Sequence, residues 1–301
     1  MATQLDKYFS DVKIPNSITK ADIKSIKDWL SKQRHLPELS DRQIAIFIHS
    51  CFGALELTKN TIESYYTIRT HAPELFNGRN AKEVAETNNV IIATVLPDLS
   101  VEKDNLILAG FYDENPEKFN VQKAVRLFFS IWDLEGNLIP DATGWRVIIS
   151  AKGFSLGHFT RITTNMGIVR KVICYLQDGL PLRLKGIHIF NAIPLVNQFL
   201  AVVKPIMKKE LYQLIKVHPT NNIESLYDYV PKDSLPTNFG GKAPSLDELI
   251  KLSNEKMKKY EPWFADDEKL ARVDESQRTG KPKNSGDIFG FDGSFKKLDF
   301  D

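Results

Sequence analysis

The sequence predicts an α/β fold, in which an all-helical N-terminal region precedes a domain built on a mostly parallel β-sheet. Two capping boxes within residues 1–76, each followed by apolar residues at helical spacing, predict the helical region. From residue 90 onward, short apolar runs alternate with helical patterns, which is typical of βαβ units. We therefore expect a helical domain over residues 1–80, an α/β domain over residues 81–260, and a polar linker with a C-terminal tail over residues 261–301.

The composition sets limits on the class of protein. The chain has 301 residues, of which 40 are basic and 38 acidic, and 42% are hydrophobic. This composition predicts a real core, and the balanced charge argues against a general nucleic-acid binder. No apolar run reaches the length of a membrane span, and the N-terminus lacks the apolar stretch of a secretory signal. Cys51 and Cys174 show no metal spacing, so we expect buried thiols in a reducing, cytoplasmic compartment and no metal site.

The helical region contains three expected helices. Thr19 to Asp22 and Ser40 to Gln43 are the two capping boxes, in which the side chains satisfy free backbone N–H groups at a helix start. A third helix is expected over residues 58–69, ended by the stretch before Pro73. Such short helices cannot bury their apolar faces alone, so we expect them to pack together as a small bundle.

The second domain is expected to alternate strands and helices. Apolar or alternating runs predict strands over residues 90–96, 106–112, 145–150, 182–190 and 214–218. Helices are expected over residues 121–131, from the turn at Gly153 to residue 176, after the fourth strand, and from Ser245 to residue 260. The polar run DESQRTGKPKNSGD predicts a linker, and the two phenylalanines of GSFKKLDFD suggest that the tail docks back on the body.

Residues 182–207 combine a basic strand with an amphipathic helix. In the strand we expect Leu182, Leu184 and Ile187 to face inward, with Arg183 and Lys185 on the other side. In the helix, an apolar stripe lies beside two lysines; the stripe is Val196, Phe199, Val203 and Met207, and the lysines are Lys204 and Lys208. This arrangement fits a helix that docks on a membrane. The alternative is an ordinary core helix with solvated lysines.

Residues 153–157, GFSLG, match the G-x-S-x-G pattern of a serine nucleophile between a strand and a helix. Asp178 followed by His188 or His218 would complete the order of an esterase triad. No HGGG-type oxyanion loop precedes the motif, however, and His188 lies within an expected strand. The alternative is that the glycines form a tight turn and Ser155 caps a helix.

Several segments together resemble the CRAL-TRIO lipid-transfer family, in the branch of the alpha-tocopherol transfer protein and its insect-type relatives. They include GFSLGH, PLRLKGIHIFNAI, the VKP step after it, LPTNFGG over residues 235–241, and SYYTIRTHAPELF over residues 64–76. The resemblance covers nearly the whole chain. It implies a three-helix N-terminal domain and an α/β domain that holds one hydrophobic molecule behind a mobile helix.

The resemblance also implies site residues. The pocket walls it implies are Phe128, Ile131, Trp145, Val147, Ile149, Ile162, Val172, Leu176, Leu182, Leu184 and Ile187. It places a membrane gate on Val196, Phe199, Val203 and Met207, and phosphoinositide contacts on Arg183 and Lys185, to which we add Lys204 and Lys208 for the membrane surface. The chain departs from the family pattern at Ser150, Lys152, Glu210 and Leu214, and FIHSCF over residues 47–52 lacks the family's basic residues. These changes weaken the implied phosphoinositide site.

The sequence is thus interpreted as a carrier, and not an enzyme. We expect a monomeric, cytoplasmic protein that associates reversibly with membranes and moves one ligand, such as a tocopherol, retinoid, carotenoid or phospholipid, without a cofactor. The alternatives are a serine esterase that uses Ser155 and a scaffold or signalling protein with the same fold but no transfer activity.

Overall fold

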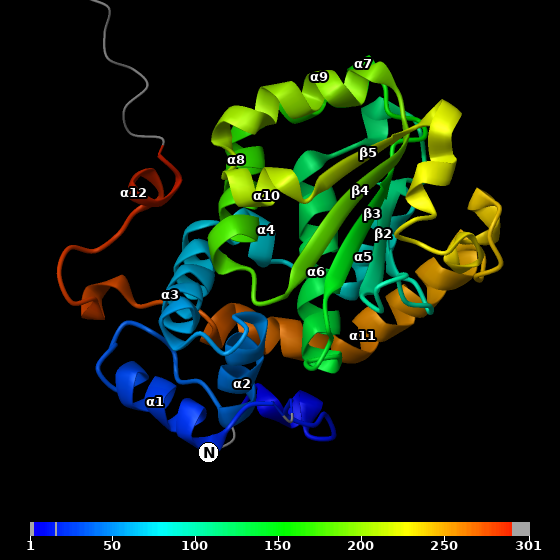
Figure 1. The fold of residues 1–301 in the computed structure, drawn as a ribbon. Helices are drawn as coiled ribbons and strands as arrows, with labels where there is room; N and C mark the ends of the chain where they lie inside the picture. Colours follow the sequence, from blue (N-terminus) through cyan, green and yellow to red (C-terminus); the bar gives the residue numbers. More distant parts are fainter. Residues whose placement is uncertain (1–2, 16, 291–301) are drawn as a thin grey trace, which may run out of the picture.

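The N-terminal region is a bundle of helices, as expected (Figure 1). The computed structural model describes residues 3–15 and 17–290. In that part of the chain α1 (Lys20–Leu30), α2 (Asp41–Ser50) and α3 (Leu55–His71) pack on one another. Both predicted capping boxes are present: Thr19 accepts from the backbone N–H of Asp22, and Ser40 from that of Gln43. Two short helices, α4 (Pro73–Phe76) and α5 (Ala81–Asn88), lead from the bundle to the sheet.

A five-stranded, mostly parallel sheet forms the second part of the molecule, which confirms the predicted fold class. Its strands are β1 (Ile91–Val95), β2 (Asn105–Phe111), β3 (Trp145–Ser150), β4 (Leu184–Ala192) and β5 (Ile215–Pro219), and they lie in sequence order. β1 pairs antiparallel with β2, and every later pair is parallel. The connecting helices are α6 (Val121–Leu138), α7 (Leu156–Thr163), α8 (Met166–Cys174), α9 (Pro194–Val203) and α10 (Lys209–Gln213).

The two faces of the sheet belong to different cores. Trp145, Val147 and Ile187 face a large cluster that also contains residues of α6, α8 and α9. Ile148 and Phe190 face a smaller cluster that is closed by residues 223–249. Because both faces are covered, the central strands are apolar on both sides, and this is the reason that they appear in the sequence as nearly continuous apolar runs.

A β-bulge in β4 explains why strict alternation does not hold there. Trp145 pairs with Leu184, but Arg146 pairs with Gly186, so Lys185 is the extra residue. As a result Leu184 and Ile187, which are three residues apart, both pack on the large cluster. The expected inward side of this strand is therefore correct, although simple alternation could not have produced it.

Several helices differ from the prediction, and the one helix expected from Gly153 to residue 176 is split into α7 and α8. α6 continues to Leu138 and α11 (Leu246–Leu270) continues well past Tyr260 with Pro262 inside it. α9 is shorter than expected: it ends at Val203, a 3-10 turn covers Lys204–Ile206, and Met207 has an extended backbone. Pro205 lies in this turn, and because its nitrogen cannot donate, the helix stops. Met207 thus does not belong to a continuous helical stripe.

The C-terminal segment packs on the helical bundle. Arg278 and Lys283 bind Glu63 of α3, and Glu275 lies 3.1 Å from His71. The short helix α12 (Ser285–Phe289) follows and buries Phe289. The run that we expected to be a linker is therefore attached to α3, while residues 293–301 lie outside the described part of the chain.

A buried ion-pair cluster joins the bundle to the sheet domain. Arg69 of α3 and Arg79 each bind both Asp133 of α6 and Asp267 of α11. All four side chains are almost fully removed from water, so each charge depends on the others for its partners.

Of the cysteines, Cys51 is buried and Cys174 only partly so, and both are free thiols.

Candidate ligand-binding cavity

An apolar cavity of about 290 Å³ lies between the sheet, α6 and α8. Its walls consist of apolar side chains and one glycine: Ile91, Ile92, Ala109, Gly110, Phe111, Phe119, Ala124, Val125, Phe128, Phe129, Trp132, Val147, Ile149, Val172, Leu176 and Ile187. The volume lies at the small end of the range for small-molecule sites. Such walls hold a ligand by removing its apolar surface from water.

The structure brings part of the predicted pocket to this cavity. Phe128, Val147, Ile149, Val172, Leu176 and Ile187 line it. Ile131 and Trp145 are buried elsewhere in the same core, and Ile162, Leu182 and Leu184 are partly buried against that core. The residues from β1 and β2 and most of those from α6 were not predicted. Helical spacing could have predicted the α6 residues, because Val125, Phe128, Phe129 and Trp132 recur at steps of three and four.

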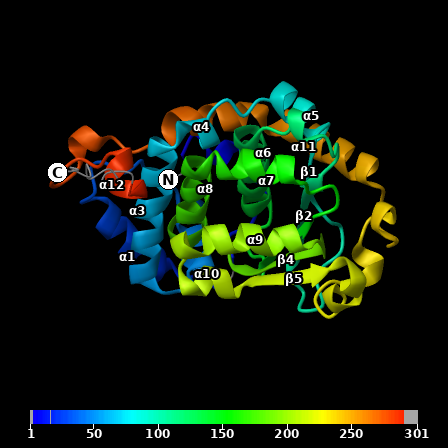
Figure 2. The same ribbon diagram turned by 90° about the horizontal axis from the view of Figure 1, so that it is seen from above.

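α9, the predicted gate helix, presents its predicted stripe to the protein interior. Val196 and Val203 are buried, and Phe199 and Met207 pack partly buried on the large cluster. No α9 residue is among those that line the cavity. The outward side is apolar as well: Ile193 just before the helix and Val202 within it are exposed, and Leu156 at the start of the neighbouring α7 is 67% exposed. Both views show α7 and α9 side by side at one end of the molecule (Figures 1 and 2).

The predicted basic residues fall into two groups. Arg183 and Lys185 lie at the start of β4, whereas α9 follows the end of that strand. Arg183 donates from Nε to the backbone oxygen of His49, and its guanidinium lies 4.4 Å from the centre of the exposed Phe52 ring. Near α9, Lys208 forms an ion pair with Asp178, while Lys204 is exposed and lies over the ring of Tyr212.

The residues of the hypothetical esterase triad are not brought together. His188 and His218 contact each other, with 3.1 Å between Nδ1 and Nε2, and His188 lies in the strand face opposite the large cluster. Gly153 has a φ of +78° and forms the expected turn. Ser155 does stand at the start of α7, but its hydroxyl makes no cap bond and lies 2.9 Å from Nδ1 of His158.

In the part of the chain that the structure describes, no carboxylate hydrogen-bonds to His158 to orient it as a catalytic base. Its ring is buried among Phe111, Phe119 and Phe154, and burial lowers its pKa, which favours the neutral ring. Among the described residues, Nε2 of His158 has no hydrogen-bond partner. The pair therefore lacks the third member by which a serine hydrolase holds its histidine.

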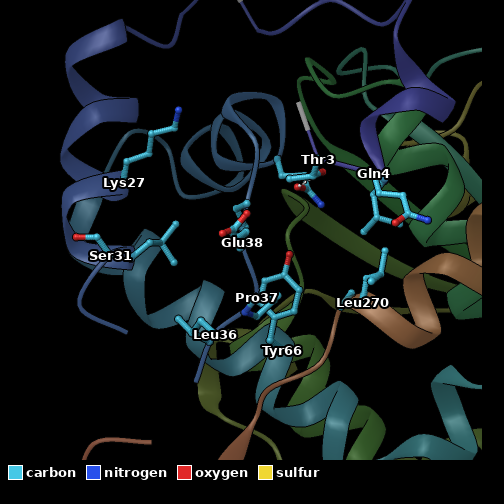
Figure 3. Close-up of a pocket in the computed structure, with 14 residues that line it drawn as sticks. Thr3, Gln4, Lys27, Ser31, Leu36, Pro37, Glu38, Tyr66 and Leu270 are labelled. Carbon is cyan, nitrogen blue, oxygen red and sulfur yellow. Dashed lines mark hydrogen bonds between the residues drawn. The ribbon is translucent and has the colours of Figure 1, made fainter. Parts of the chain in front are cut away.

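A larger hollow of about 650 Å³ lies in the helical region (Figure 3). The labelled residues come from the N-terminal segment, α1 and the loop around Pro37, together with Tyr66 of α3 and Leu270 of α11. Lys27, Glu38 and Gln4 contribute charged or polar groups to its walls. This mixed lining does not suit a hydrophobic ligand, and the smaller apolar cavity is therefore the better candidate site.

Comparison with known proteins identifies the domain that holds the cavity. Residues 101–241 match the model of the CRAL/TRIO domain. The chain contains a CRAL/TRIO domain. The match covers β2 to β5 and the helices between them, so the resemblance noted from the sequence is confirmed. Residues 16–85 match the Pinta-like UBA domain, which corresponds to the helical bundle and most of α5. The CRAL/TRIO family binds lipophilic ligands. Two residues of the cavity wall, Ile91 and Ile92, lie before the region that matches the family model.

Relatives of the CRAL/TRIO domain share modest identity with this chain. The alpha-tocopherol transfer protein-like protein of Homo sapiens is 24% identical over 234 residues, which cover 75% of this chain and 66% of that protein, just under two thirds of its length. Clavesin-1 of Xenopus laevis is 29% identical over 143 residues, 47% of this chain and 42% of clavesin-1. The crystal structure of Sfh5 matches with a TM-score of 0.53 and 17% identity, covering 77% of this chain and 92% of Sfh5, and this likeness concerns the fold. Within residues 3–15 and 17–290, no helix is both long and apolar enough to cross a membrane.

Proposed function

We propose that this protein carries one hydrophobic molecule in the cavity between the sheet, α6 and α8, and transfers it between membranes. The observation that carries the proposal is the lining of the cavity, which is formed by apolar side chains and one glycine throughout. Burial of a ligand there is worth about 25 cal/mol for each Å² of apolar surface. Binding of this kind requires neither covalent chemistry nor a cofactor.

The volume of the cavity limits the ligand. About 290 Å³ suits one slender chain or ring system, such as a retinoid, better than a two-chain phospholipid. A tocopherol or carotenoid requires that the walls move apart. The neighbouring α9 is the element that we propose to move, because its outward face is apolar and its inward face packs on the same core.

The membrane contact is proposed to be the apolar surface of α7 and α9. Leu156, Ile193 and Val202 are exposed there, and Lys204 adds a positive charge beside them. An apolar face with flanking cations binds the interface of anionic membranes. Arg183 and the exposed Lys185 form a separate candidate for an anionic head group, next to Phe52.

Two experiments test the proposal. The protein is purified without detergent, and its organic extract is analysed by mass spectrometry; we expect one class of hydrophobic molecule at near-stoichiometric amount. In the second, delipidated protein is mixed with retinol in donor vesicles and acceptor vesicles, and we expect faster transfer than without protein.

A matched pair of variants tests whether retinol binds in the cavity. Ala124→Leu adds bulk to the cavity wall, whereas Ala85→Leu adds the same bulk on α5 outside it. We expect the first to lower retinol uptake several-fold and the second to leave it unchanged. An empty extract together with no uptake of retinol would contradict the proposal and favour a scaffold protein.

A further inference from the structure

A C-terminal strap, residues 272–290, runs from the end of α11 along the outer side of the bundle to α8 (Figure 1). On α3, Arg278 of the strap forms an ion pair with Glu63, and the Ser285 hydroxyl donates to the backbone oxygen of His71. The strap then forms α12, which contacts α8. It therefore ties α8 to the helical bundle.

Phe289 fastens the strap to α8. Its side chain is 1% exposed and belongs to the large cluster. Arg170 of α8 donates from Nη1 to the backbone oxygen of Phe289 over 3.0 Å, and Nζ of Lys171 lies 5.1 Å from the centre of the Phe289 ring. Lys171 also forms an ion pair with Glu74 of α4. Two successive residues of α8 are thus held from outside the sheet domain.

Another side of α8 belongs to the cavity. Val172 lines the cavity, and so does Leu176 in the π-helical turn Tyr175–Gly179 that follows the helix. The backbone is irregular at both ends of this short helix, because a turn at Asn165 separates it from α7 and the π-helical turn comes after it. Such end segments are where a helix can change direction as a unit.

The other walls of the cavity are fixed more firmly. β2, β3 and β4 each pair with a strand on both sides, and β1 packs against α5 and α11. α6 is held by Asp133, which binds both Arg69 and Arg79, and by the ion pair of Arg126 with Glu83. α9 contacts α7, which leads directly into α8, so a movement of α9 reaches the cavity through α8. α8 is therefore the wall that we expect to move when a molecule passes.

We propose that the strap is a latch on α8 that sets how fast a hydrophobic molecule enters and leaves the cavity. The inference rests on the proposed function and adds a control of ligand exchange to it. With Phe289 docked, α8 is held in place; when α12 detaches, α8 can swing about its two irregular ends and open the wall.

The position of the latch determines its effect on binding. Among the described residues, those that line the cavity come from the sheet, α6, α8 and the segments beside them, and none comes from the strap. The strap therefore makes no contact with the carried molecule and docks equally well on the empty and the filled protein. Such a latch changes the association and dissociation rates by the same factor and leaves the Kd unchanged.

The test measures retinol exchange in the full-length, delipidated protein. Stopped-flow fluorescence gives the association rate, and mixing the retinol complex with excess vesicles gives the dissociation rate. Phe289→Ala removes the ring that packs in the core, and we expect both rates to rise at least about fivefold with the Kd within about twofold of the natural value.

A milder variant and its control make the same comparison, and they suffice if Phe289→Ala does not fold. Arg170→Met keeps the aliphatic stem but removes the donor to the Phe289 backbone, so both rates should rise roughly two- to fivefold. Arg161→Met, on the neighbouring α7, removes a guanidinium that binds the exposed Glu117. It should leave both rates within about 1.5-fold of the natural values.

Hydrogen exchange separates a latch from a general loss of stability. In each strap variant that folds, the amides of α8 should exchange several-fold faster, while those of α6 keep their natural rate. If α6 and α8 exchange faster together, the contact between the strap and α8 merely supports the fold, and the latch is excluded.

Three kinetic results would overturn the inference, and they differ in what else they imply. If retinol enters and leaves both variants at the natural rates, the strap is not a latch, while the carrier function stands. If dissociation alone becomes faster and the Kd rises with it, the strap stabilises the filled protein instead, and the carrier function again stands. If retinol does not bind the natural protein, the carrier function fails and the inference fails with it.

Discussion

At the scale of single residues, Ser155 tests whether the protein has any hydrolase character. Its hydroxyl contacts His158, and among the described residues no carboxylate hydrogen-bonds to that ring. We expect Ser155→Ala to lower the free energy of unfolding by about 1 kcal/mol, the usual value of one hydrogen bond, and to leave retinol binding within twofold. Urea unfolding and a fluorophosphonate probe provide the measurements. Stoichiometric labelling of Ser155 by the probe would revive the esterase interpretation.

His188 predicts a pH dependence of stability. The ring is fully buried, and burial, together with the neighbouring His218 and Arg146, lowers its pKa to about 3. In the unfolded chain the pKa is about 6.5, so between these values the unfolded state binds a proton that the folded state does not. Stability must therefore fall as the pH decreases through this window. His188 alone contributes a loss of about 1 kcal/mol between pH 7.5 and 5.5.

Urea unfolding of the natural protein and of His188→Gln at these two pH values measures this contribution. The variant should lose less stability than the natural protein on acidification. The range stops at pH 5.5 because Glu63 and Glu275, whose pKa values are lowered to about 2, change the stability only in more acidic solution. Equal losses in both proteins would show that His188 is not responsible.

At the scale of elements, two neighbouring valines of α9 separate membrane binding from stability. Val202 is 43% exposed, whereas Val203 is 0% exposed and packs in the large cluster. Val202→Asp should leave the free energy of unfolding within about 0.5 kcal/mol and weaken binding to anionic vesicles roughly tenfold, since it removes apolar contact and adds repulsion. Val203→Asp should destabilise the fold by several kcal/mol, because it buries an unpaired carboxylate.

Vesicle sedimentation and thermal melting of both α9 variants provide the test. If Val202→Asp sediments with vesicles as the natural protein does, α9 is not the membrane contact. If the Val203→Asp variant is as stable as the natural protein, the Val203 side chain does not pack in the core.

The sequence predicted most elements because their local signals agree with the fold. Capping boxes fixed the starts of α1 and α2, the start expected at Ser245 agrees with that of α11, and apolar runs located all five strands. Helix ends were harder to predict. α11 passes through Pro262, where packing of Trp263 and Phe264 in the core outweighs the lost hydrogen bond, and α9 stops because Pro205 follows it.

The cavity was predicted only in part, because its shape depends on packing between distant segments. Periodicity shows that Phe128 and Trp132 share a face of α6, but not which part of that face meets a void and which meets the bundle. β1 and β2 contribute Ile92 and Phe111 through pairings that no local pattern specifies. The bulge at Lys185 likewise arises from the register between β3 and β4.

At the scale of the whole molecule, the buried ion pairs make the helical bundle and the sheet domain interdependent. Asp267 binds both Arg69 and Arg79, and these arginines hold the pKa of its carboxyl below the usual range, so it is charged in the folded protein. Removal of its charge leaves Asp133 as the carboxylate that binds both buried arginines, while Arg79 keeps a further contact of 3.5 Å to Glu268. A loss of this kind typically costs about 3–5 kcal/mol.

Asp267→Asn should therefore lower the free energy of unfolding by about 3–5 kcal/mol. The preceding residue is a matched control: the Asp266 side chain is 19% exposed, against 4% for Asp267, and binds Lys7 near the surface. Asp266→Asn should lower the free energy of unfolding by less than about 1 kcal/mol.

Urea unfolding followed by tryptophan fluorescence and by circular dichroism measures the stability of both variants. The natural protein should unfold in one transition by both probes, because breaking the cluster exposes charges of α3, α6 and α11 together. Similar small losses in the two variants, or separate transitions in the natural protein, would show that the cluster does not couple the two parts.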